Sequence, residues 1–158
     1  WGLCMRKRSK YKPRGVRVDA LNYVLTSIKP LASLKSEVAT LRIKNHGALA
    51  AVCQGRAGRT DINSLVSALN IAEAIAILGV GDEYTSEIRQ GQDALHTMTT
   101  RGVELGDKFI FRAPELQAIN LAMDVHDAQL DAVTVQQLER SIEYVQKVIR
   151  SGGARAIA

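Results

Sequence analysis

The residues with the clearest potential for chemistry are a histidine and three aspartates in the last third of the chain. Asp124, Asp127 and Asp131 are spaced so that a helix places their carboxylates on one face, and His126 lies beside them. Such a cluster could bind a hard cation, or crowding could raise the pKa of one carboxyl group. However, His126 occupies a position of the apolar stripe. We interpret it as a core histidine with a hydrogen-bonded ring nitrogen beside a solvated acidic stripe, and expect neither a metal site nor a catalytic residue.

A second candidate is the turn that leads into a helix from Gly55. Backbone N–H groups at a helix N-terminus attract anions, so Arg56, Arg59 and Thr60 could hold one there. A solvated turn is the simpler interpretation of the same residues. Elsewhere, no histidine has a Ser or Cys placed to complete a nucleophilic set, and no glycine-rich phosphate loop follows a strand pattern. We therefore expect a protein that is not an enzyme and needs no cofactor.

The strongest charge feature lies at the start of the chain. Seven cations and no acid fall in the first 17 residues, whereas the other 141 residues carry 14 Lys and Arg against 16 Asp and Glu. Without apolar periodicity, this arm should be flexible when free. Cations interleaved with one aromatic suit contacts to successive phosphates without reading bases. We therefore expect the arm to bind nucleic acid or a nucleoprotein complex through Arg6, Lys7, Arg8, Lys10, Tyr11, Lys12, Arg14 and Arg17.

The charge pattern also permits two alternatives. The arm could be a solubilising tail without a ligand, while an anionic membrane surface is disfavoured because the arm has no apolar face or lipidation site. Alternatively, the protein could be an inhibitor or adaptor that binds a host protein through a partly acidic helical face. That face would consist of Asp124, Asp127, Asp131, Glu139 and Glu143.

Size and composition favour one helical domain. The chain has 158 residues, is 46% hydrophobic and only 4% aromatic, and its aliphatic residues suit helix packing. We expect a basic arm over 1–18, a helical domain over 19–151 and a short tail over 152–158. The apolar run 71–80 is too short to span a bilayer, and no signal peptide or disulfide framework is evident. A cytoplasmic protein is the simplest expectation. Residues 1–4 precede a natural-looking start at Met5 and are left out of the fold prediction.

The elements that must position these residues follow from three-four apolar spacing. We expect an all-α protein, an antiparallel bundle of five or six helices whose exposed stripes could support a homodimer. The segment 61–78, capped by Thr60, is apolar nearly all round and should be central. Gly91 should allow the backbone of a neighbouring helix to approach closely. The segment 107–112 should be a connection between helices whose two phenylalanine side chains pack into the core. Asn45 should fix the register in which the helices of the bundle pack, and Cys53 should act as a small hydrophobic residue of the core. The expected helices span 19–28, 31–54, 61–78, 82–102, 114–133 and 135–150.

Three segments carry a resemblance to known proteins. The opening 5–13, the segment Leu41-Arg42-Ile43-Lys44-Asn45-His46 and the segment His126-Asp127-Ala128-Gln129-Leu130-Asp131 together resemble a group of small uncharacterised helical proteins encoded by phages and prophages of proteobacteria. The resemblance extends over most of the chain from Met5, and no functional residue carries over from it. It implies a setting: the cytoplasm of an infected bacterium, where small accessory proteins bind nucleic acid or host machinery.

Overall fold

The computed structural model describes residues 28–153, and within them the chain is helical with no β-strand. The prediction of an all-α fold is confirmed for this part of the chain. The basic arm and most of the helix expected over 19–28 lie outside the described residues. The described elements are the 3₁₀ turn η1 (Leu31–Ser33), α2 (Lys35–Cys53), α3 (Arg59–Ile77), the 3₁₀ turn η2 (Asp82–Tyr84), α4 (Thr85–Glu104), α5 (Ala113–Ala132) and α6 (Val135–Arg150).

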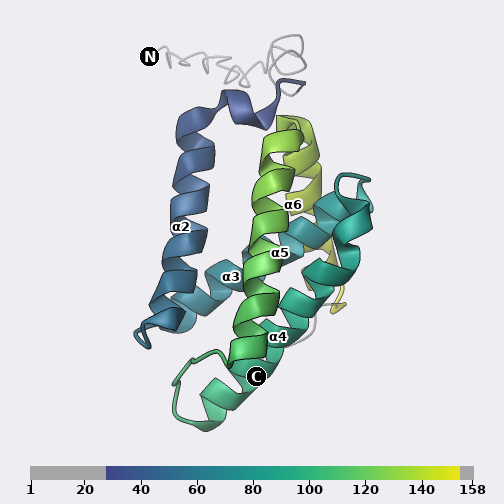
Figure 1. The fold of residues 1–158 in the computed structure, drawn as a ribbon. Helices are drawn as coiled ribbons and strands as arrows, with labels where there is room; N and C mark the ends of the chain where they lie inside the picture. Colours follow the sequence, from purple (N-terminus) through teal and green to yellow (C-terminus); the bar gives the residue numbers. More distant parts are fainter. Residues whose placement is uncertain (1–27, 154–158) are drawn as a thin grey trace, which may run out of the picture.

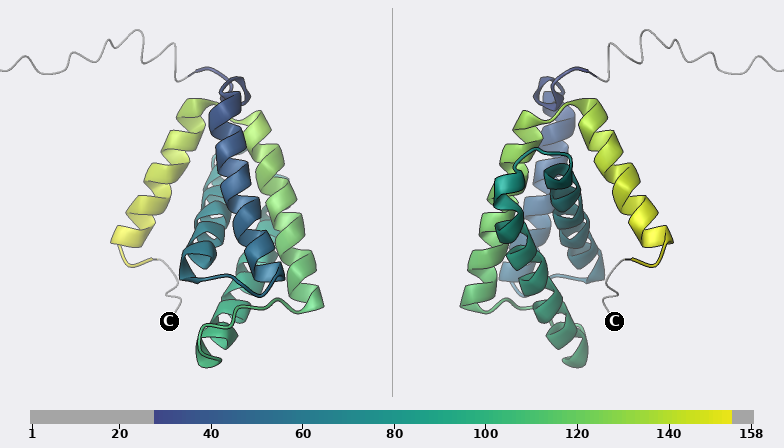
Figure 2. Two further views of the ribbon diagram at one scale, coloured as in Figure 1. Left: turned by 90° about the vertical axis from the view of Figure 1, so that its left-hand side faces the viewer. Right: turned by 90° about the vertical axis from the view of Figure 1, so that its right-hand side faces the viewer.

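Helix α3 is the centre of the fold, as its nearly uniform apolar surface predicts. It packs against α2, α4, α5 and α6, while α4 and α5 form a long antiparallel pair (Figure 1). Leu65, Leu69 and Ile75 of α3 are fully buried. The regular antiparallel bundle is seen only in part, because α5 and α6 diverge from their short connection on either side of α2 (Figure 2).

The close approach of α4 to α5 depends on a glycine, as the sequence predicts. A Cβ placed on Gly91 would lie 2.4 Å from Cβ of Ala122 and 3.4 Å from the backbone oxygen of Ala118. Real carbon atoms do not approach so closely, so a side chain here would push the two helices apart. Gly91 therefore sets the distance between α4 and α5.

The connection between α4 and α5 is pinned to the core, which confirms the interpretation of 107–112. Phe109 is 3% exposed and packs on Gly102, where a Cβ would lie 2.4 Å from the phenyl ring. Both guanidinium nitrogens of Arg101 donate to the carboxylate of Glu115 at 2.7 Å. This hydrogen bond from Arg101 lowers the pKa of Glu115. The ion pair and the buried ring thus hold the start of α5 against the end of α4.

Several helix ends differ from the prediction. The chain between Pro30 and Leu34 forms η1 instead of the first turn of α2, because Leu31 N donates to Val133 O at 2.8 Å and ties this segment to the start of α6. The N-cap of α3 is Gly58 and not Thr60, since the Asp61 carboxylate accepts from Gly58 N at 2.9 Å.

Three further local predictions have mixed outcomes. Thr134 followed three residues later by Gln137 predicts a capping box, and the two residues form it at the start of α6. Asn45 is buried at 3% exposure, as its position on the apolar stripe requires. The interpretation of Cys53 as a core residue is wrong, because it is the last residue of α2 and its side chain is exposed.

Candidate binding groove and predicted site residues

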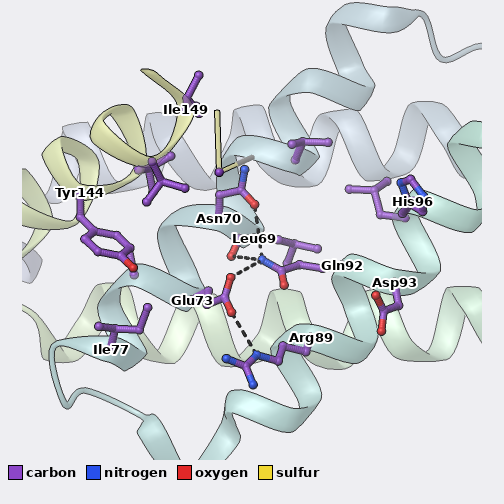
Figure 3. Close-up of a pocket in the computed structure, with 16 residues that line it drawn as sticks. Leu69, Asn70, Glu73, Ile77, Arg89, Gln92, Asp93, His96, Tyr144 and Ile149 are labelled. Atoms are coloured by element: carbon purple, nitrogen blue, oxygen red, sulfur yellow. Dashed lines mark hydrogen bonds and ion pairs between the residues drawn. The ribbon is translucent and has the colours of Figure 1, made fainter. Parts of the chain in front are cut away.

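A groove of about 450 Å³ lies between α6 and the α3–α4 pair (Figure 3). This volume is in the range of small-molecule and peptide-side-chain sites. Val145, Val148 and Ile149, from the C-terminal half of α6, supply its apolar wall, and Tyr144 lies at the same end. The groove therefore lies along the C-terminal half of α6, opposite α3 and α4.

The opposite wall carries a chain of polar side chains from α3 and α4. The Glu73 carboxylate accepts from Arg89 Nε and from Gln92 Nε2, each at 3.0 Å, and Gln92 Nε2 also lies 3.4 Å from Asn70 Oδ1 (Figure 3). The Glu73 side chain is 27% exposed, whereas Arg89 is 63% exposed. His96 lies beyond Gln92 along α4. Because each side chain fixes its neighbour, this wall can orient a polar group bound in the groove.

Helix α6 covers the groove loosely. Within α6, all of whose residues are described, Ser141 alone is fully buried, while Ile142 is 36% and Ile149 is 54% exposed. Leu138 and Val145 are half-buried on the side that faces α3. An amphipathic helix normally buries its apolar stripe. The stripe of α6 is therefore only partly used by the described fold.

The predicted acidic face is divided by ion pairs with α2. Arg42 Nη2 lies 2.7 Å from the Asp131 carboxylate, and Arg42 Nε lies 3.5 Å from the Asp127 carboxylate. His46 Nε2 lies 2.7 Å from the other oxygen of Asp127. Two of the five acidic positions thus hold α2 against α5.

The other three acidic positions are exposed and lie on different helices. Asp124 is on α5, and Glu139 and Glu143 are on α6. These three acids thus lie on two helices that diverge from their short connection (Figure 2).

His126 is fully buried, in agreement with its interpretation as a core residue. Within the described residues neither ring nitrogen makes a hydrogen bond of good geometry, although the Gln129 side chain lies close enough to interact with the ring. Burial lowers the pKa of His126 from 6.5 to about 4, and the nearby charge of Asp127 opposes this shift only in part. The imidazole is therefore a neutral core group at pH 7.

This histidine should make the protein acid-sensitive. The unfolded chain binds a proton near pH 6.5 and the folded chain only near pH 4, so stability contributed by the neutral ring is complete above pH 6.5 and is lost as the pH falls towards 4. The loss should reach about 3 kcal/mol of unfolding free energy. Urea denaturation at several pH values should show a flatter acid limb for His126→Leu than for the parent. Equal slopes for the parent and His126→Leu would contradict the assignment.

The predicted anion site at the start of α3 is engaged within the protein. Both oxygens of Asp107 accept from the Arg59 guanidinium at 2.9 Å, and this hydrogen bond lowers the pKa of Asp107. Arg56 Nε donates to Gln54 Oε1 at 2.5 Å. Thr60 lies in the first turn of α3. The nearby backbone N–H of Gly58 already donates a hydrogen bond to the Asp61 carboxylate. The described contacts therefore match the solvated-turn interpretation better than an open anion site.

The predicted nucleic-acid-binding residues, Arg6 to Arg17, lie outside the described residues. In the described part, no cluster of three His, Cys, Asp or Glu side chains has the geometry of a metal site. None of the helices between residues 28 and 153 combines the length and hydrophobicity that a bilayer span requires. No family model, curated protein or solved structure matches this chain.

The polar wall of the groove and the Arg42 contacts were not anticipated from the sequence. Glu73 does leave a signal, because it is an acid within the apolar run 71–80. Arg42 and His46 lie four residues apart and so share a face of α2. Their partners, however, are more than 80 residues away in sequence, and no local pattern indicates such a pairing.

Proposed function

We propose that this protein is a non-enzymatic accessory protein that binds nucleic acid or a nucleoprotein complex through its basic arm. The observation that carries the proposal is the separation of charge: seven cations without an acid in residues 1–17, against 13 Lys and Arg and 15 Asp and Glu in residues 28–153. Polyanions release counterions when such a cation cluster binds them. The resemblance to phage-encoded proteins implies the cytoplasm of a bacterial host as the setting for this activity.

The contacts within the helical body support the same assignment. Four of its arginines form ion pairs with its own acids, which leaves fewer cations to attract phosphate: Arg42, Arg59, Arg89 and Arg101. The body has a net charge of −2 over residues 28–153. An acidic body repels nucleic acid weakly, so a polyanion should bind at the arm and not across the helices.

A second candidate function is binding of a host protein, and the groove between α6 and the α3–α4 pair favours it. Its apolar wall and fixed polar groups can accept an amphipathic segment. In this alternative, the surface used differs from the acidic face expected from the sequence.

Affinity purification from bacterial lysate, with and without nuclease, tests the proposal. We expect RNA or DNA to be recovered with the protein, and its other partners to be released by nuclease, because nucleic acid connects them. A variant that lacks residues 1–17 should recover neither. A partner protein that survives nuclease and is recovered equally by the truncated variant would contradict the proposal and favour the groove.

A further inference from the structure

One edge of α6 carries an apolar row that the described fold leaves partly exposed. Val135, Ile142 and Ile149 are seven residues apart, so they lie along one edge of the helix. Ile142 and Ile149 are 36% and 54% exposed. Ile28 is 57% exposed and lies at the N-terminal end of this edge, because Val135 N donates to Lys29 O. We call Ile28, Val135, Ile142 and Ile149 the α6 row.

The row has the spacing of a helix–helix seam. Leu138 and Val145 complete a three-four repeat with it, which is the pattern of the a and d positions in a coiled coil. These two residues are half-buried on the α3 side. Val135 and Leu138 pack against the core cluster that contains Ile75 of α3. The part of the repeat that remains available to another helix is therefore the edge with Ile142 and Ile149.

The charges of α6 indicate which helix fits this edge. The N-terminal half of α6 carries Glu139, Arg140 and Glu143, a net charge of −1, whereas the C-terminal half carries Lys147 and Arg150, a net charge of +2. Two copies of α6 aligned in parallel would place like charges opposite each other, which is unfavourable. Two antiparallel copies would place acids opposite bases on both sides of a two-fold axis. The surface is therefore complementary to itself.

We propose that a second copy of this chain covers Ile142 and Ile149 of the α6 row by packing its own α6 antiparallel to the first. If Ile142 lies beside the partner's Ile149, a rise of about 1.5 Å per residue brings Glu143 level with position 148 of the other helix. Glu143 then lies within about 3 Å along the axis of both the partner's Lys147 and the partner's Arg150. The apolar row and the charges select the same register.

The expected dimer is weak and has a consequence for the arm. In this register the two helices overlap over residues 141–150, so Ile142 and Ile149 of each copy bury less than the roughly 800 Å² per partner of a standard interface, and dissociation should occur in the micromolar range. The chain enters the described fold at Ile28, beside the first residue of α6. In the register above, position 135 of one copy is level with position 156 of the other, so the two arms would leave about 32 Å apart along the seam. This consequence rests on the proposed function, whereas the dimer itself does not.

Sedimentation velocity on the full chain without nucleic acid, over about 5–500 µM, tests the dimer. We expect a concentration-dependent dimer, and at least a tenfold weaker one for Ile142→Asp and for Ile149→Asp. Leu121→Asp is the matched control, because Leu121 is also exposed, at 48%, but lies on α5. Glu143→Arg alone, and Lys147→Glu with Arg150→Glu alone, should each dimerise poorly, and an equimolar mixture of the two variants should restore the dimer.

Cysteine cross-linking tests the orientation in a background with Cys4→Ser and Cys53→Ser. Ile142→Cys mixed with Ile149→Cys should form a disulfide-linked heterodimer faster than Ile142→Cys alone forms a homodimer. The reverse order would overturn the antiparallel arrangement. A parent protein that stays monomeric throughout would overturn the dimer. If, in that monomer, removing residues 1–27 increased thiol labelling of Ile149→Cys, the row would belong to the chain's own N-terminal segment.

Discussion

Replacing the seven cations of the arm with glutamine should weaken nucleic-acid binding by about three orders of magnitude at low salt. Five or six phosphate contacts account for that factor, because each contact releases a condensed counterion. Fluorescence anisotropy with a labelled duplex and a labelled single strand measures the change. The variant replaces Arg6, Lys7, Arg8, Lys10, Lys12, Arg14 and Arg17.

A control with the same net charge separates the arm from the overall charge. It also loses seven cations, all of them exposed side chains of the body that take no part in the ion pairs described above: Lys29, Lys35, Lys44, Arg56, Lys108, Arg112 and Arg140. We expect this control to bind within about tenfold of the parent, since general electrostatic attraction contributes less than direct phosphate contacts. Equal losses in the two variants would contradict binding by the arm.

Gly91→Ala should cost about 2–3 kcal/mol of unfolding free energy, although alanine is the better helix former by about 1 kcal/mol. The added Cβ would lie 2.4 Å from Cβ of Ala122, and both atoms are attached directly to backbones. The clash can be relieved only by moving α4 and α5 apart, which opens the core around Leu95 and Ile119, both at most 2% exposed. Chemical denaturation monitored by circular dichroism measures the loss.

Two further variants make this prediction specific. Gly47→Ala in α2 should stabilise the protein by about 0.5–1 kcal/mol, because its Cβ would have no described neighbour within 4 Å. Combining Gly91→Ala with Ala122→Gly moves the methyl group to the other helix and should restore most of the stability. A neutral Gly91→Ala, or no rescue in the double variant, would show that the contact does not set the helix spacing.

The sequence predicts the parts of this fold that depend on local patterns. The apolar surface of 61–78 identifies the central helix, since such a segment must be covered on all sides. Gly91 on an apolar stripe predicts a close helix contact, and Thr134 with Gln137 predicts the start of α6. In each case the signal and the structure it determines lie within a few residues.

The features that were not predicted depend on distant contacts. Leu31 is held out of α2 by a hydrogen bond to Val133, 102 positions later. Arg42 of α2 forms ion pairs with Asp127 and Asp131 of α5. Acids that were expected to be solvated therefore take part in a contact between two helices. The apolar stripe of α6 predicts which face of the helix is apolar, but it does not predict what covers that face. The same spacing suits a fully buried helix and the half-exposed one observed here.

The measurement that tests the central claim most directly is the affinity of the full chain for duplex DNA as a function of salt concentration. If the seven cations of the arm bind phosphate, the logarithm of the association constant should fall linearly with the logarithm of salt, with a slope of roughly −4 to −6. The chain lacking residues 1–17 should have a slope near zero or no detectable binding. A shallow slope for the full chain, or the same slope without the arm, would contradict the account.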